Sequence, residues 1–213
     1  MTSNLYIIII AIFFTAITNS GCGYRNIEAY PESACIYLEA EDAQIVTPMQ
    51  IGDDVNASGG NYVFTNEENA GLFSFTFFAP YSGQYVIDAR IRTQPVLPYC
   101  TNSGACNSFF VTIDDGATTG NEPTVYHAGQ LSEFSWQAVN VTNISTEETC
   151  SDTCSDREPT IWSLLKGEHS LTFSGREAYT YLDSILIRYC VPGSCNSIGH
   201  EQCLTQIGKS RLP

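Results

Sequence analysis

The sequence predicts an all-β protein, a two-sheet antiparallel β-sandwich of the jelly-roll type stapled by disulfides. From Cys35 to Cys190, short apolar or alternating runs are separated by clusters of Gly, Pro, Asn and Ser. The run Leu72–Phe77 alternates apolar with polar residues, as a half-buried strand does. No segment keeps helical periodicity over three turns. Many short strands with regular turn signals are typical of sandwiches and jelly rolls.

The chain opens with the apolar run Tyr6–Phe14, which is long enough for a signal-peptide core and short for a membrane span. Small residues up to Ser20 suit a cleavage site, so residues 1–20 are expected to be a signal peptide. A retained anchor or a lipid anchor is the alternative, because Met1–Asn4 lacks Lys and Arg and Gly21–Cys22 follows. We expect a mature chain without a membrane span, secreted to the extracellular space and free or associated with the cell surface.

Residues 21–34 form an N-terminal segment, residues 35–190 the sandwich, and residues 191–213 a cysteine-containing tail with little core potential. Two polar insertions, Thr93–Asn107 and Thr142–Pro159, interrupt the sandwich. The predicted strands are Ile36–Glu41, Asn61–Thr65, Leu72–Phe78, Gln84–Arg92, Ser108–Asp114, Thr124–His127, Phe134–Val141, Ile161–Leu165, Ser170–Phe173 and Tyr181–Tyr189.

Nine cysteines behind a signal peptide indicate disulfides. Antiparallel pairing of the first and last strands would place Cys35 beside Cys190, which makes them the firmest predicted pair. The odd ninth cysteine leaves Cys22 modified, unpaired or bonded to another chain, and Cys195 and Cys203 have no assigned partner. Two further pairs have the spacing of loop staples: Cys100 with Cys106, and Cys150 with Cys154.

Acidic residues mark both ends of the predicted sandwich. Glu39 and Glu41 are two residues apart and would share one face of a strand, while Asp183 interrupts an apolar strand. The register that brings Cys35 to Cys190 also brings these three carboxylates together. Crowded carboxylates repel each other unless a hard cation lies among them, and Ca²⁺ prefers oxygen ligands. The sequence therefore predicts Glu39, Glu41 and Asp183 as metal ligands.

The chain is strongly acidic, with 23 Asp and Glu against 9 Lys and Arg and a net charge of −14. Such a chain repels phosphate backbones, so nucleic acid is not an expected partner. Asn56, Asn140 and Asn143 begin N-x-Ser/Thr motifs and would carry glycans in a eukaryotic secretory pathway.

Seven segments resemble, in order, the motifs of carbohydrate-binding module families six and thirty-five, which are calcium-bearing jelly rolls similar to galactose-binding domains. The resemblance covers about 150 residues. The matching segments are Leu38–Ala43, Ala57–Val63, Phe75–Tyr85, Val111–Gly116, Trp136–Val139, Leu165–Leu171 and Leu182–Ile185.

The resemblance implies a structural calcium held by the three acidic residues above, and a site where glycans stack on aromatic rings and bind polar groups. Family members often carry a ligand Trp and a ligand Asn where this chain has Glu133 and Tyr181. Trp136 and Trp162 are expected in the core. The candidate glycan contacts are therefore loop residues: Tyr99, Glu133, Phe134, Tyr179 and Tyr181.

Catalysis is not expected. Glu39 and Glu41 could form a glycosidase pair, but they would lie at a strand edge and not across a cleft. No Gly-x-Ser-x-Gly elbow, His-Glu-x-x-His motif or phosphate loop occurs. The sequence predicts a secreted, non-catalytic carbohydrate-binding protein with structural Ca²⁺. The alternative is an extracellular structural or adhesive protein that binds another protein through its cysteine-stapled loops.

Overall fold

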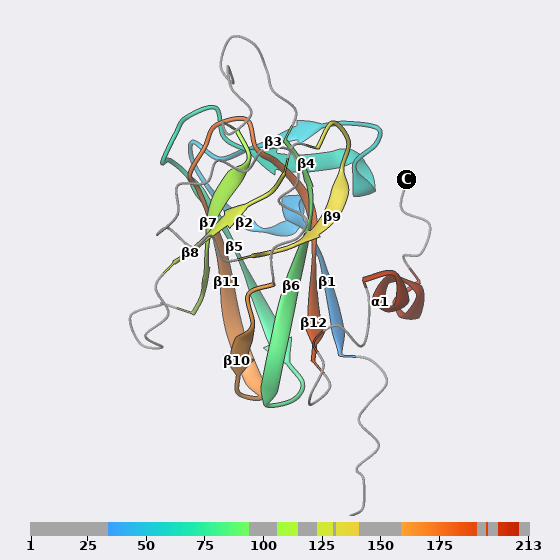
Figure 1. Ribbon diagram of the computed structural model, residues 1–213. Helices are drawn as coiled ribbons and strands as arrows, with labels where there is room; N and C mark the ends of the chain where they lie inside the picture. The colour runs from blue at the N-terminus through green and yellow to red at the C-terminus, as the bar shows by residue number, and fades with distance from the viewer. Residues whose placement is uncertain are drawn as a thin grey trace, which may run out of the picture. The chain divides into compact units, whose positions relative to one another are not determined.

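The structure is a computed structural model that describes residues 34–93, 106–114, 123–129, 131–140, 159–190, 195 and 200–208. Within these residues, twelve strands form two sheets whose strand pairs are antiparallel (Figure 1). The predicted all-β sandwich is confirmed. The helices of the described part are all too short or too polar to cross a bilayer.

The first sheet has seven strands in the order β10-β6-β12-β4-β3, with β1 also paired to β12 and β9 to β6. Its strands are β1 Cys35–Glu39, β3 Gln50–Asp53, β4 Asn61–Phe64, β6 Gly83–Arg92, β9 Ser135–Ala138, β10 Trp162–Leu164 and β12 Tyr181–Tyr189.

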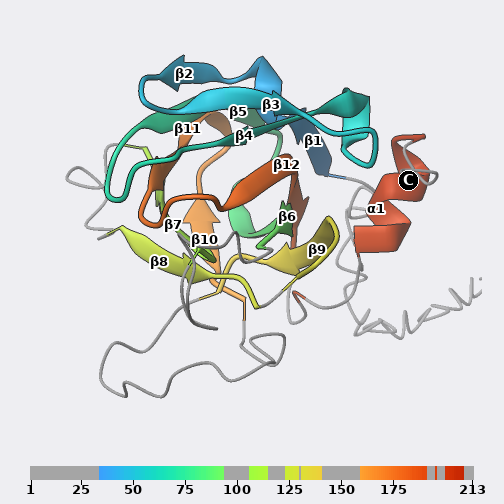
Figure 2. The ribbon, with the colours of Figure 1, turned by 90° about the horizontal axis from the view of Figure 1, so that it is seen from above.

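The second sheet has five strands in the order β2-β5-β11-β7-β8. The strands of this second sheet are β2 Gln44–Val46, β5 Leu72–Ala79, β7 Ser108–Ile113, β8 Thr124–His127 and β11 Gly167–Gly175. Seen from above, β2 and β3 lie on one side of the sandwich and β8 and β9 on the opposite side (Figure 2).

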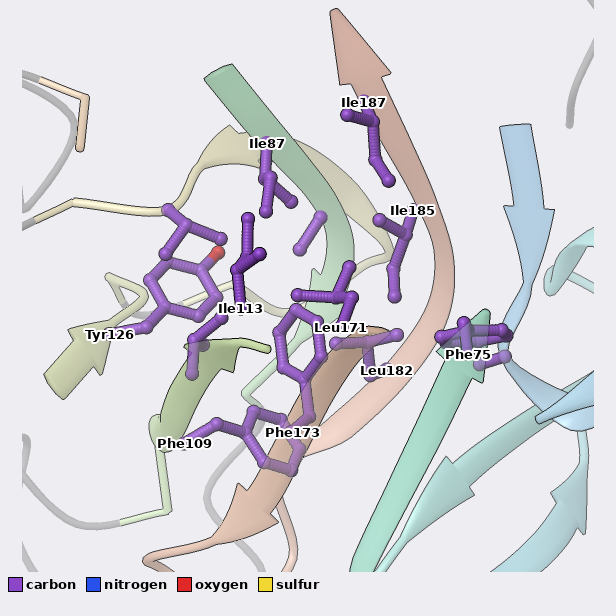
Figure 3. Packing of buried hydrophobic residues seen from close by; sticks show 14 of the residues in the cluster. Phe75, Ile87, Phe109, Ile113, Tyr126, Leu171, Phe173, Leu182, Ile185 and Ile187 are labelled. Atoms are coloured by element: carbon purple, nitrogen blue, oxygen red, sulfur yellow. The ribbon is translucent and has the colours of Figure 1, made fainter. Parts of the chain in front are cut away.

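The main core lies between the two sheets. Alternation along β5 buries every second residue, and the ring of Phe73 stacks on Phe173 of β11 with centroids 5.2 Å apart. Ile87 of β6 and Ile185 of β12 contribute from the other sheet (Figure 3). Each large apolar side chain that is fully buried in this way stabilises the fold by roughly 1.5–3 kcal/mol.

The first and last strands of the predicted sandwich pair antiparallel, as expected, with Cys35 opposite Arg188 and Glu39 opposite Ser184. The first strand is shorter than predicted, because Ala40–Asp42 forms a 3₁₀ helix, η1. Glu41 therefore lies on that turn and does not share a strand face with Glu39. Strands β2 and β3 were not predicted from the sequence.

The predicted bond between Cys35 and Cys190 is wrong. Cys35 bonds Cys203, and Cys190 bonds Cys195. The register explains the error, because Cys190 lies beyond the end of β12, where its backbone N–H donates to the carbonyl of Gln84 at 2.7 Å. Cys106 is also disulfide-bonded. Cys100, Cys150 and Cys154 lie outside the described residues.

The C-terminal tail has more core potential than predicted, because it forms helix α1, His200–Gln206. Cys203 and Leu204 of this helix are buried against Leu186, in a cluster separate from the main core. Ile185 and Ile187 face the main core, so Leu186 between them points to the outer face of the first sheet. Figure 1 shows α1 beside β1.

The two tryptophans have different surroundings. Trp162 is 5% exposed and belongs to the main core, as predicted. Trp136 was also predicted in the core, but it packs in the outer cluster under α1, with its ring 6.3 Å from that of His200. The difference arises because the covering helix comes from the tail.

Replacement of both Cys35 and Cys203 by Ser should release α1 from β1. The bond joins residues 168 positions apart, so we expect a loss of about 2–4 kcal/mol in the free energy of unfolding. Trp136 fluorescence should also change, because His200 and Tyr37 contact its ring. The control is the double Ser variant of the other bond, which spans 5 positions and should cost less. Equal losses without a fluorescence change would contradict this account.

Candidate functional site

The loop between β3 and β4, residues 54–60, is held by its own hydrogen bonds. The carboxylate Oδ1 of Asp54 accepts the backbone N–H of Asn56 at 2.8 Å and its side-chain amide at 3.1 Å. The backbone N–H of Asp54 donates to the carbonyl of Gly60 at 3.0 Å. Such a closed turn holds the residues between its ends in fixed directions.

Asp183 lies at a β-bulge in β12. Leu182 pairs with Ile91 and Ser184 with Arg90, so Asp183 is the extra residue. Its side chain is fully buried, and Oδ1 accepts the backbone N–H of Ser58 at 2.8 Å. Oδ2 forms an ion pair with Arg90. Burial raises the pKa of Asp183 to about 6, although Arg90 acts in the opposite direction.

Two glutamates lie next to this ion pair. Glu39 accepts the hydroxyl of Tyr37 at 2.9 Å and the hydroxyl of Ser58 at 3.0 Å. Burial raises the pKa of Glu41, and the charges of Glu39 and Asp183 raise it further. The Oε2 atom of Glu41 is buried without a hydrogen-bond partner. We call Glu39, Glu41 and Asp183 the acidic group.

A glycine makes room for Glu41. A Cβ atom at Gly59 would lie 2.8 Å from Oε1 of Glu41, and Gly59 has φ of +67°. The positive φ favours glycine at this position, because other residues rarely adopt that backbone conformation.

The acidic group fits a calcium ion only in part. No three His, Cys, Asp or Glu side chains within the described ranges are placed to hold a metal ion. Asp183 and Glu39 accept hydrogen bonds from Arg90, Tyr37 and Ser58, whereas Ca²⁺ takes six to eight oxygen ligands. The buried oxygen of Glu41 without a partner is the feature that suits a cation. Calcium fits here if Asp183 or Glu39 exchanges one of its present donors for the ion.

Arg92 is packed against three aromatic rings. Its guanidinium carbon lies 4.6 Å from the ring centroid of Phe134, 4.8 Å from that of Tyr181 and 5.5 Å from that of Tyr62. Arg92 also pairs with Asp54, whose pKa is lowered by the N–H of Asn56 and by this arginine. The residues of this aromatic cluster are Ala57, Tyr62, Phe64, Phe134, Tyr179 and Tyr181.

A cavity of about 180 Å³ opens beside the aromatic cluster. Arg90 and Arg92 each pair with an aspartate, and Glu133 is exposed. Among the described residues of the lining, Glu133 alone carries a carboxylate. The lining combines guanidinium, amide, hydroxyl and carboxylate groups with one aromatic ring, and consists of Asn56, Arg90, Arg92, Ser132, Glu133 and Phe134.

The predicted glycan contacts are distributed over two places. Glu133 and Phe134 line the cavity. Tyr179 and Tyr181 lie in the aromatic cluster, where Tyr181 is 9% exposed. Tyr99 lies outside the described residues.

Sequence reasoning missed four residues of the cavity lining, which are Asn56, Arg90, Arg92 and Ser132. A signal for the arginines was present, since Asp88, Arg90 and Arg92 share one face of β6 within an otherwise apolar strand. Three charged residues on one face of a central strand indicate a polar site, because buried charges need partners.

A larger cavity, of about 460 Å³, lies along β1 and β5. Glu39 lines it, so this member of the acidic group is open to the cavity. Its lining carries no arginine among the described residues, and is Tyr37, Leu38, Glu39, Asp42, Gln44, Ser74, Phe75 and Thr76. We therefore take the smaller cavity as the candidate site.

No protein-family model and no curated protein matches the chain, but solved structures do. The GH26-CBM35 β-(1,4)-mannanase of Podospora anserina is 16% identical with a TM-score of 0.52, over 78% of this chain and 30% of that one. An exo-β-1,3-galactanase of Phanerochaete chrysosporium is 16% identical with a TM-score of 0.50, over 73% and 29%. A family 35 carbohydrate-binding module of Clostridium thermocellum is 16% identical with a TM-score of 0.49, over 73% and 98%.

The matches to the two enzymes show a shared fold, and the chain spans about 30% of the length of each. A mannanase whose name includes a family 35 carbohydrate-binding module is thus among its structural neighbours, in agreement with the resemblance of the sequence motifs.

Replacement of Arg92 by Lys tests what this guanidinium does. Lysine keeps the charge beside Asp54 but loses the planar group that contacts Phe134, Tyr181 and Tyr62. We expect a loss of about 1–2 kcal/mol in the free energy of unfolding and a change in near-UV circular dichroism. The control, Arg176→Lys, removes a more exposed guanidinium that binds Glu177 and the hydroxyl of Ser108, and should cost less than Arg92→Lys because its ion pair is more exposed. Similar losses in both variants would contradict a special role of Arg92.

Proposed function

We propose that this chain is a secreted, non-catalytic carbohydrate-binding protein whose ligand site is the 180 Å³ cavity. The observation that carries the proposal is the convergence of guanidinium, amide, hydroxyl and carboxylate groups around one aromatic ring. A sugar presents hydroxyls to such polar groups, which would fix its orientation in the cavity. The neighbouring folds include a mannanase and a galactanase, which supports a carbohydrate ligand.

The size and charge of the cavity favour a single neutral sugar residue. Drug-sized ligands occupy pockets of about 300–1,000 Å³, so a cavity of about 180 Å³ suits one sugar ring, such as a chain end. Asp183 and Asp54 compensate the charges of Arg90 and Arg92. The remaining charge is that of Glu133, which would accept hydrogen bonds from sugar hydroxyls.

The lining supports binding without cleavage. Glycosidases place two carboxyl groups about 5–9.5 Å apart across the scissile bond. Glu133 is the one carboxylate among the described lining residues. A glycan bound here would meet no second acid or base from the described part of the lining.

Disulfides support the secreted part of the proposal. Cys35–Cys203 and Cys190–Cys195 bonds form and persist in oxidising compartments such as the extracellular space. The proposed signal peptide, residues 1–20, lies outside the described residues.

Glu133→Ala should weaken glycan binding at least tenfold, because it removes the exposed carboxylate of the cavity. This corresponds to about 1.4 kcal/mol. The measurement is a glycan-array screen of the wild type, followed by titration of the best sugar into both proteins. Glu168→Ala is the control, because Glu168 is an exposed glutamate of β11 outside the cavity lining. Both variants should keep the wild-type melting temperature.

Equal affinity of Glu133→Ala and the wild type would exclude this cavity as the ligand site. If the wild type binds no glycan, the rival function gains support, in which the insertions Thr93–Asn107 and Thr142–Pro159 bind another protein. That outcome leaves the fold unchanged but overturns the carbohydrate-binding proposal.

We also propose that the acidic group binds a structural Ca²⁺ through Glu41, Glu39 and Asp183. The support is the burial of Glu41, which together with repulsion from Glu39 and Asp183 raises its pKa, and its buried oxygen that lacks a partner. A bound cation would stiffen the junction of η1, the 54–60 loop and β12. It has no catalytic role in this proposal.

Glu41→Gln should change stability in opposite directions with and without calcium. Without calcium the variant should melt higher than the wild type, because it removes a repelled buried charge. With millimolar calcium the wild type should gain, by about 2–4 °C for each kcal/mol of binding energy, and the variant should not. Melting with added Ca²⁺ and with chelator checks this, and exposed Glu67 provides the control, Glu67→Gln. If calcium shifts neither protein, the calcium proposal fails.

A further inference from the structure

The sequence contains three N-x-Ser/Thr motifs, and the structure places the asparagines of two of them in opposite environments, one buried and one exposed. Asn140 is 2% exposed, and its side-chain amide donates to the carbonyl of His127 at 3.2 Å. It also forms a β-bridge with Pro159. A sugar on this buried amide would have to open the fold around it, so we expect folded molecules to carry Asn140 unmodified. Asn143 lies outside the described residues.

Asn56 has the opposite environment. It is exposed, and its amide nitrogen makes a 3.1 Å hydrogen bond to Oδ1 of Asp54. An amide nitrogen that is joined to a sugar keeps one hydrogen, so this bond can persist and orient the first sugar. The backbone of Asn56 is held by the N–H bond to Asp54 and by Arg90, which donates to its carbonyl at 3.2 Å. Neither contact involves the atom that would be modified.

Asn56 is also one of the residues that line the 180 Å³ cavity. We propose that Asn56 carries an N-linked glycan whose first sugars cover this cavity, so that the modification regulates ligand binding there. The regulatory part rests on the proposed carbohydrate-binding function, whereas the position of the modification does not.

The modification is an ordinary group transfer from a lipid-pyrophosphate-linked oligosaccharide. A bond forms between Nδ2 of Asn56 and C1 of the first sugar, the bond from C1 to the pyrophosphate oxygen breaks, and the lipid pyrophosphate leaves as the amide loses one proton. Ser58, the third residue of the motif, is 2% exposed after folding. The transfer therefore precedes the folding of the 54–60 loop.

A tethered sugar competes strongly with a free one. A group on a short tether has an effective concentration in the millimolar range. The cavity is small and holds one ring, so its intrinsic affinity for a free sugar is modest. The glycan of Asn56 would cover the cavity when this effective concentration exceeds both the dissociation constant of the tethered sugar and the concentration of free sugar.

The test compares the full chain produced by eukaryotic secretory cells with the same chain produced in a bacterial periplasm, where this transfer does not occur. Glycopeptide masses should show a glycan at Asn56 and none at Asn140. The unmodified wild type should bind the sugar found by array at least tenfold more tightly than the glycosylated wild type. Asn143→Gln from eukaryotic cells, as control, should bind like the glycosylated wild type. The periplasmic wild type keeps the Asn56 side chain, so it separates loss of the glycan from loss of a lining residue.

A second measurement does not need a free ligand. If the glycan lies over the cavity, an endoglycosidase should trim it slowly on the folded wild type and at least tenfold faster on Glu133→Ala, where a contact is lost. An unmodified Asn56 in the secreted protein would overturn the inference, as would equal trimming rates. If unmodified protein binds no sugar at all, the proposed function fails, while slow trimming of the Asn56 glycan would still support its contact with the cavity.

Discussion

The buried ion pair between Asp183 and Arg90 is the interaction on which the site depends. It joins a bulge in β12 to the neighbouring strand β6, and Asp183 also accepts the backbone N–H of Ser58. Both charged side chains are almost fully buried. Removal of one partner from such a pair typically costs about 3–5 kcal/mol, because the other charge is left without compensation. The pair thus fixes the 54–60 loop against the sheet, and the loop supplies a residue to the cavity.

Arg90 connects the acidic group with the candidate ligand cavity. Its guanidinium pairs with Asp183, donates to the carbonyl of Asn56 and lies 5.6 Å from the ring centroid of Phe134. A cation bound at the acidic group would compete with Arg90 for Asp183, and the change would reach Asn56 and Phe134 through the same side chain. In the two proposals above, this arginine would couple the calcium site to the sugar site, so that calcium and a sugar would influence each other's binding.

Local patterns in the sequence predict the strands well, because alternation and turn residues act within a few positions. Pairing of the first and last strands follows from their patterns, and so does the neighbourhood of Glu39 and Asp183. The bond between Cys35 and Cys203 could not be predicted, because these two residues come together only when a seven-residue helix packs on the outer face of the sheet. Pairing of Arg90 with the bulged Asp183 is likewise a tertiary contact without a local signal beyond the charged face of β6.

The packing of the arginines determines what kind of binding the cavity can support. Phe134 is 8% exposed, and both Arg90 and Arg92 lie over its ring, so a sugar cannot stack on the full aromatic face. Affinity must then come from hydrogen bonds to groups such as Glu133, each of which replaces a bond to water and gains only about 0.5–1.5 kcal/mol. A site of this kind selects a ligand by the positions of its hydroxyls and binds it weakly. Under the proposed function, a sugar tethered at Asn56 would exclude free ligands because its effective concentration exceeds theirs, and not because it binds more tightly.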